Sequence, residues 1–248
     1  MFYFFKKANL DFSFYNEEIA QHAQKDINIQ QLLENQLIRM LNSSLENLNQ
    51  FVNRIPEFYN LDSVDQSLLF EAASLELLAL RMAYRLKPNS DIVILANNMV
   101  LHRSQFVQTF GEEWFHMIER LSEQLNTIQI DLSAFSCLAA LTVVTGRPGL
   151  ENPHCLEMVE NKIITALRDH TCYNAEAQSK HHYLSRILSI LPELRSIGEH
   201  CLVVLHRKQL PALSHYQQSQ QQQQQQQHFN QESQQQQSLQ NTMLWSLP

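Results

Sequence analysis

The stretch FVNRIPEFYNLDSVDQSLLFEAASLELLALRMAYRLKP, residues 51–88, determines the fold class. Its Ile55-Pro56 step ends one helix, because proline lacks an amide donor and clashes with the preceding turn. Asp-Ser-Val-Asp at 62–65 supplies cap residues for a second helix, which ends at the Lys-Pro-Asn sequence of residues 87–89. That helix is apolar on more than one side, which is typical of a helix buried by neighbours on both faces. We therefore predict a helical sandwich with this helix in its middle layer.

The composition agrees with a helical globular protein. The 248 residues include only 4 glycines and 7 prolines, few for a fold with many tight turns. The hydrophobic fraction of 44% allows a sizeable core, and the net charge of −7 argues against nucleic-acid binding through overall charge. No run reaches the ~18 apolar residues of a membrane span, so we expect no membrane association.

Apolar spacing predicts the elements on either side of this stretch. Steps of three and four residues indicate helices at 27–51, 104–126, 131–145, 152–172 and 179–209. Pro192 is expected to dent or kink the last of them. The apolar residues between Ile92 and Leu101 flank Asn97-Asn98, which predicts a short β-hairpin and no other sheet.

Composition also divides the chain into four parts. We expect an irregular arm at 1–25, a helical domain at 26–210, a glutamine-rich linker at 211–238 and a candidate terminal helix at 239–248. Sixteen of the 24 residues from Gln217 to Gln240 are glutamine, too polar to offset the cost of ordering the chain. The apolar end of the chain is either a docking segment or a frayed tail.

Several motifs resemble the ligand-binding domains of nuclear receptors. The signature region carries Phe51-Val-Asn-Arg-Ile-Pro-Glu-Phe58, then Asp65-Gln66 and Glu76-Leu77. Further motifs are similar to the Nurr-type orphan subfamily: Leu80–Pro88, Val100–Arg103, Phe110-Gly111, Asp131–Ala140 and Leu184–Arg195. With this order and spacing, residues 26–210 are identified as a nuclear receptor ligand-binding domain.

The resemblance implies an all-α, three-layer antiparallel sandwich and a nuclear role in transcription regulation, with no enzymatic activity and no cofactor. Partners would be transcriptional coregulators and a second receptor, either of the retinoid X receptor type or a second copy. A receptor of this type contacts DNA through zinc fingers, which this sequence lacks. The alternative is a DNA-independent dimerisation or scaffold module derived from such a receptor.

The subfamily resemblance also implies a ligand pocket filled by bulky side chains. Large aromatic residues that supply such bulk are Phe70, Phe106, Phe110, Trp114, Phe115 and Phe135. Each of them is equally well explained as an ordinary core residue elsewhere in the sandwich. We expect no cavity of steroid size and activity without a ligand.

The resemblance points to two positions for coregulator binding. Many nuclear receptors clamp an LxxLL helix between a Lys and a Glu, and Nurr-type receptors reverse the two charges. In this sequence the two clamp positions correspond to Asn53 and Asn241, and both residues are neutral. Arg54 is a weaker candidate for capping a peptide, and the candidate groove residues are Asn53, Arg54, Gln66, Leu69, Asn241 and Leu244.

Dimerisation is the other surface that the resemblance suggests. Glu76 and Arg147 match positions whose charges mark receptors that pair with the retinoid X receptor, although their ion pair also suits a helix-to-loop brace without a partner. The helix around Leu191, Leu194 and Arg195 would supply the dimer face.

Histidines and cysteines raise the rival possibility of an enzyme or a metal site. The clusters are His154-Cys155, His170-Thr-Cys172 and His181-His182. None has a recognised ligand spacing, and the four cysteines form no CxxC pair. We therefore predict no metal ligand and no catalytic residue.

Overall fold

The computed structural model describes residues 44–87, 90–94 and 100–207. The chain divides into two units, Met1–Gln209 and Leu210–Pro248, and every described residue lies in the first. The predicted arm, the linker and the terminal segment lie outside the described residues.

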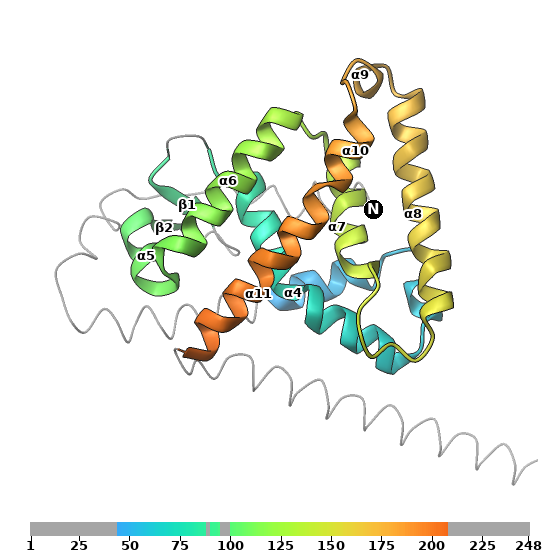
Figure 1. The fold of residues 1–248 in the computed structure, drawn as a ribbon, viewed down its shortest axis with the longest axis horizontal. Coiled ribbons are helices and arrows are strands. Elements are labelled where there is room, and N and C mark those ends of the chain that lie inside the picture. Colours follow the sequence, from blue (N-terminus) through green and yellow to red (C-terminus); the bar gives the residue numbers. More distant parts are fainter. Residues whose placement is uncertain (1–43, 88–89, 95–99, 208–248) are drawn as a thin grey trace, which may run out of the picture. The chain divides into compact units, whose positions relative to one another are not determined.

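The described residues form helices and one hairpin (Figure 1). Residues 44–52 are helical, followed by the 3-10 helix η1, Phe58–Asn60. The remaining elements, in chain order, are α4 (Ser63–Arg85), β1 (Ile92–Ile94), β2 (Val100–His102), α5 (Arg103–Phe110), α6 (Glu112–Ile128), α7 (Leu132–Val144), α8 (Pro153–Tyr173), α9 (Ala175–Gln178), α10 (Tyr183–Leu188) and α11 (Ile190–Arg207). The predicted all-α class with one short hairpin is confirmed.

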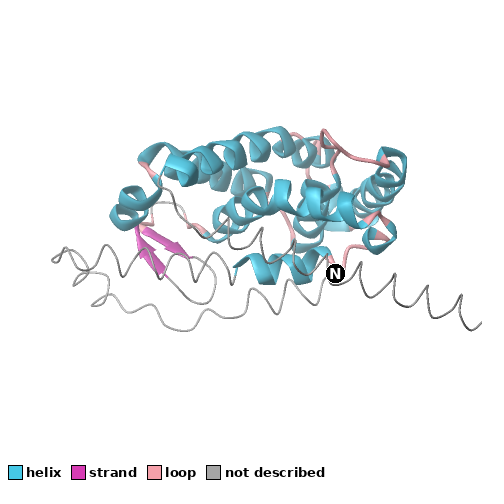
Figure 2. Ribbon diagram, turned by 90° about the horizontal axis from the view of Figure 1, so that it is seen from below, coloured by secondary structure: helices cyan, strands magenta, loops and turns pink. Residues whose placement is uncertain are grey.

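Helix α4 lies at the centre of this arrangement. Asp62 caps it, accepting a hydrogen bond from the Val64 amide at 2.9 Å. It packs against α6, α7 and α11, and Figure 2 shows the helices stacked in layers. From residue 73 to residue 80 every side chain is buried, Leu77 and Leu80 included. Burial on every side explains why the sequence of α4 has no continuous polar face.

The hairpin lies beside α5 and the end of α4. Its antiparallel strands pair Ile92 with His102, Val93 with Leu101 and Ile94 with Val100. Residues 95–99, which include the predicted Asn97-Asn98 turn, are outside the described residues.

Two of the predicted helices are divided. The segment 104–126 is interrupted at Gly111, whose φ of 92° lies outside the helical region and is favourable only for glycine. The segment 179–209 is turn-like up to His182 and is interrupted again at Ser189. Pro192 accounts for that second break, because it cannot donate to the Leu188 carbonyl four residues earlier and its ring clashes there.

One buried carboxylate connects distant parts of the chain. Asp65, in the first turn of α4, is 1% exposed and accepts hydrogen bonds from the Glu151 amide at 2.8 Å and the Asn152 amide at 3.0 Å. Asn152 in turn caps α8 through the Cys155 amide. The start of α8 is therefore held directly on the start of α4.

Candidate functional site

A cluster of four aromatic side chains fills the corner between α5 and α6. The ring centre of Phe106 lies 4.7 Å from that of Phe110, 5.2 Å from Trp114 and 5.7 Å from Phe115. Each of the four is at most 2% exposed. The turn at Gly111 folds α6 back so that residues on both helices meet. Four of the six predicted pocket-filling residues therefore lie together.

The other two aromatic candidates lie elsewhere. Phe135, on α7, packs against Tyr84 near the end of α4, with ring centres 4.1 Å apart. Phe70 lies in the first half of α4 and is 4% exposed. Both are core residues of other regions, which is the alternative that the sequence left open.

The aromatic cluster contains one buried polar atom without a partner. Among the described residues, no acceptor reaches the indole Nε1 of Trp114. The Arg103 guanidinium lies over the Phe115 ring at 4.7 Å, on the α5 side of the cluster. The surroundings of Trp114 are therefore apolar and aromatic.

The Glu76 and Arg147 side chains form a buried ion pair. The Arg147 Nη2 donates to Glu76 Oε2 at 2.7 Å, and the two side chains are 9% and 5% exposed. The same nitrogen donates to the Thr142 carbonyl at 3.2 Å. The pair joins α4 to the loop between α7 and α8, which is the brace geometry considered from the sequence.

The predicted dimer residues on α11 face in different directions. Leu194 is 0% exposed, so it belongs to the core and cannot contribute to a free surface, while Leu191 is half-buried. Arg195 donates to the Gly146 carbonyl at 3.2 Å. Leu202 and Val203, which the apolar spacing did not distinguish, are 41% and 47% exposed and add partly exposed apolar surface to α11.

The candidate groove residues also separate. Asn53 is exposed just after the helix at 44–52, and its amide donates to Asn49 Oδ1 at 3.1 Å. Gln66 donates to the Leu61 carbonyl at 2.7 Å, so it braces the turn before α4. Leu69 is 0% exposed and is a core residue, not a groove residue. Arg54 is exposed, and Asn241 and Leu244 lie outside the described residues.

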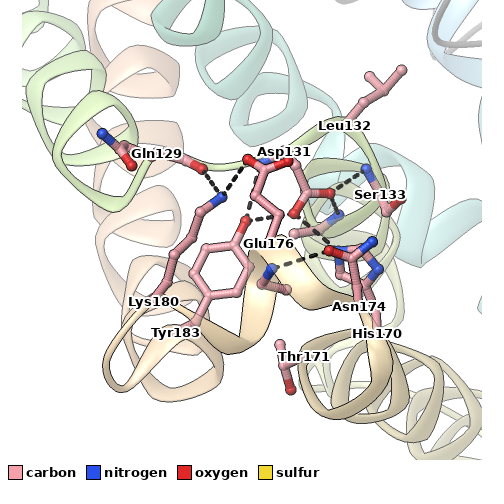
Figure 3. A network of polar contacts seen from close by, with 12 residues as sticks. Gln129, Asp131, Leu132, Ser133, His170, Thr171, Asn174, Glu176, Lys180 and Tyr183 are labelled. Atoms are coloured by element: carbon pink, nitrogen blue, oxygen red, sulfur yellow. Dashed lines mark hydrogen bonds and ion pairs between the residues drawn. The ribbon is translucent and has the colours of Figure 1, made fainter.

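A polar network that the sequence did not predict joins α7, α8 and α10 (Figure 3). Asp131 Oδ1 caps α7, accepting from the Ser133 and Ala134 amides. Its Oδ2 accepts from the Tyr183 hydroxyl at 2.8 Å and lies 2.9 Å from His170 Nε2. The partners lie 39 and 52 residues away, so no local pattern reveals the network.

The network shifts the ionisation of two of its groups. Burial raises the pKa of Asp131, but hydrogen bonds from His170, the Ala134 amide and Tyr183 outweigh it and leave the pKa below its usual value. Burial and the negative charge of Asp131 raise the pKa of the Tyr183 hydroxyl. Both groups are therefore stabilised in their ordinary neutral-pH forms, carboxylate and phenol.

Two histidines of the candidate clusters lie beside carboxylates. His170 belongs to the Asp131 network, and His154 lies 3.7 Å from Glu157 on an exposed face. Burial raises the pKa of the Cys137 thiol to about 11, which keeps it protonated. Across 44–87, 90–94 and 100–207, no group of three His, Cys, Asp or Glu side chains is placed to hold a metal ion. No helix in the same ranges is both apolar enough and long enough to span a bilayer.

A protein-family model matches most of the chain. Residues 24–210 match the family described as the ligand-binding domain of nuclear hormone receptor. This range includes every described residue.

Individual relatives agree with that match. The chain is 46% identical to the probable nuclear hormone receptor HR38 of Drosophila melanogaster over 189 residues, 76% of this chain and 17% of that protein. It is 41% identical to nuclear receptor subfamily 4 group A member 2 of Xenopus tropicalis over 192 residues, 77% of this chain and 32% of that protein. It is 38% identical to member 1 of the same group from Xenopus laevis, with the same coverage. The chain thus spans about a third or less of the length of these relatives.

Proposed function

The chain belongs to the family of nuclear hormone receptor ligand-binding domains, and from that premise we propose that it regulates transcription in the nucleus by binding coregulators and a receptor partner. The observation that carries the proposal is the family match across residues 24–210, in which the described helices and hairpin lie. The similarity to two members of nuclear receptor subfamily 4 group A supports the assignment to the Nurr-type subfamily.

A reporter assay tests this function. The chain, fused to an unrelated DNA-binding domain, is expected to change reporter expression relative to that domain alone. The control is the same fusion with Leu77→Asp, which places a charge in the core and removes the fold. Equal expression from all three proteins would contradict a role in transcription. Dimerisation without any change in expression would favour the scaffold alternative.

The dimer face is proposed to be the partly exposed side of α11. Leu191, Leu202 and Val203 offer partly exposed apolar surface there, which is the kind of surface that receptor partners bury. The Leu202→Arg variant should weaken association with a second copy or with a retinoid X receptor ligand-binding domain in sedimentation velocity. Met158→Arg is a matched control, because Met158 is 51% exposed on α8, outside the proposed face. Equal loss in both variants would refute this face.

Ligand independence is proposed from the aromatic cluster. Phe106, Phe110, Trp114 and Phe115 occupy the corner between α5 and α6 with their own rings and leave the surroundings apolar. Native mass spectrometry of the purified chain should give the mass of the protein alone. A stoichiometric apolar ligand retained after mild purification would overturn the proposal.

Coregulator binding is proposed to lack the usual charge clamp. With asparagines at 53 and 241, an LxxLL peptide loses about 1–2 kcal/mol of charge-assisted hydrogen bonding at each end. That corresponds to about one to three powers of ten in affinity. In fluorescence anisotropy, conventional coactivator peptides should bind weakly, and Asn53→Glu with Asn241→Lys should strengthen binding. Tight binding by the unchanged protein would contradict the proposal.

A further inference from the structure

Gly198 lies inside α11, at the point where this helix meets α4. It is buried, and a Cβ atom at this position would lie 2.6 Å from Glu76 Cγ and 3.5 Å from the Glu76 amide nitrogen. Real Cβ atoms essentially never come within 3.0 Å of a neighbour. Glycine is unfavourable inside a helix, so its presence here indicates a packing requirement.

The Glu76 side chain is not free to move away from a Cβ atom at position 198. Its carboxylate is held by Arg147 at 2.7 Å, and both side chains are almost fully buried. The clashing Cγ lies in the middle of the glutamate side chain, so moving it also moves the carboxylate away from Arg147. A side chain at 198 therefore either displaces α11 or disturbs the ion pair.

A second contact ties α11 to the same loop. Arg195, one helical turn before Gly198, donates to the carbonyl of Gly146, which directly precedes Arg147. The loop is thus bound to α4 through Arg147 and to α11 through Gly146. The close contact between Gly198 and Glu76 therefore bears on both the position of α11 and the ion pair.

We propose that Gly198 is a positioning residue that couples the Glu76–Arg147 ion pair to α11 and thereby sets the receptor-binding face of Leu191 and Leu202. The expected effect on association rests on the proposed dimerisation function, whereas the contact between Gly198 and Glu76 does not depend on it. The absence of a side chain at 198 lets the ion pair form while α11 keeps full contact with α4.

The test of the geometry is a substitution cycle read by thermal unfolding. Gly198→Ala should lower Tm in the unchanged protein. In the background Glu76→Ala with Arg147→Met, the same substitution should raise Tm, because Cγ is gone and alanine is the better helix residue. This background removes both charges together, so it leaves no unpaired ion. Gly146→Ala is the matched control and should leave Tm nearly unchanged, because a Cβ there meets nothing within 4 Å.

Association is measured on the same variants by sedimentation velocity. Gly198→Ala should raise the dissociation constant for the receptor partner by about tenfold, which corresponds to about 1.4 kcal/mol. In the background without the ion pair, it should cause no further loss.

If Gly198→Ala lowers Tm equally in both backgrounds, the positioning role is wrong. If Gly198→Ala lowers Tm in the unchanged protein and raises it in the background without the ion pair, but association is unchanged in every variant, the coupling to the dimer face is wrong. If the unchanged protein does not associate at all, the proposed dimerisation fails, while the Tm cycle still decides the role of Gly198.

Discussion

The Asp131 carboxylate allows a prediction whose size follows from its contacts. Asp131→Ala removes the cap of α7, worth about 1 kcal/mol. It also removes the acceptor for His170 and Tyr183, two part-buried hydrogen bonds worth about 1–1.5 kcal/mol each in net stability. The expected loss is about 3–4 kcal/mol. For a domain of this size, that lowers Tm by about 6–16 °C.

The control substitution isolates the network from the cap. Asp62→Ala removes the cap of α4, an exposed carboxylate that accepts from Val64. Its cost should be about 1 kcal/mol. The difference between the two variants in urea unfolding then measures the bonds to His170 and Tyr183.

The pH dependence gives a second, independent readout. Because the folded-state pKa of Asp131 lies below its usual value, the ionised carboxylate stabilises the fold above the unfolded pKa of about 3.9. That stabilisation is lost as the pH falls through the lower folded-state pKa. The stability gap between the unchanged protein and Asp131→Asn should therefore shrink as the pH falls below about 4. A loss below 1 kcal/mol for Asp131→Ala, or a gap that stays constant in acid, would refute the reasoning.

Three further predictions concern the core, the ion pair and the thiols. Leu69→Ala should destabilise the fold by about 2–5 kcal/mol in urea unfolding, and a change under half a kcal/mol would show that this leucine is not packed as described. Arg147→Met leaves the buried Glu76 carboxylate without its cation and should cost about 3–5 kcal/mol, most of which should return in the double variant with Glu76→Ala. In thiol labelling, Cys172 is exposed and should react in the folded protein, whereas Cys201, which is 1% exposed and whose pKa burial raises, should react only on unfolding. Rapid labelling of Cys201 under native conditions would contradict the packing of α11.

The elements that the sequence predicted correctly depend on local signals. The cap at Asp62 and the apolar residues on either side of Asn97-Asn98 act over a few residues, and the cap and the paired strands are both present in the structure. Gly111 was not recognised as a break, because the apolar spacing continues on both sides of it and a glycine inside a helical pattern is often tolerated.

The orientation of individual side chains was harder to predict. Apolar spacing places Leu69 and Leu194 on helices, but it does not say which neighbouring helix covers them, and both are fully buried. The partners of Asp131 lie 39 and 52 residues away, and the contact of Gly198 with Glu76 depends on how two helices cross. Such contacts follow from tertiary packing, which periodicity does not contain.

The link between Asp65 and the start of α8 has a consequence for the order of folding. Its hydrogen bonds join residues 86 and 87 positions apart, so they close a long loop at a higher entropy cost than the local contacts within each helix. Contacts of this kind form only after the intervening helices have collapsed into place. The amide protons of Glu151 and Asn152 should therefore gain protection from solvent exchange late in refolding, and these two protons report when the chain has completed its native topology.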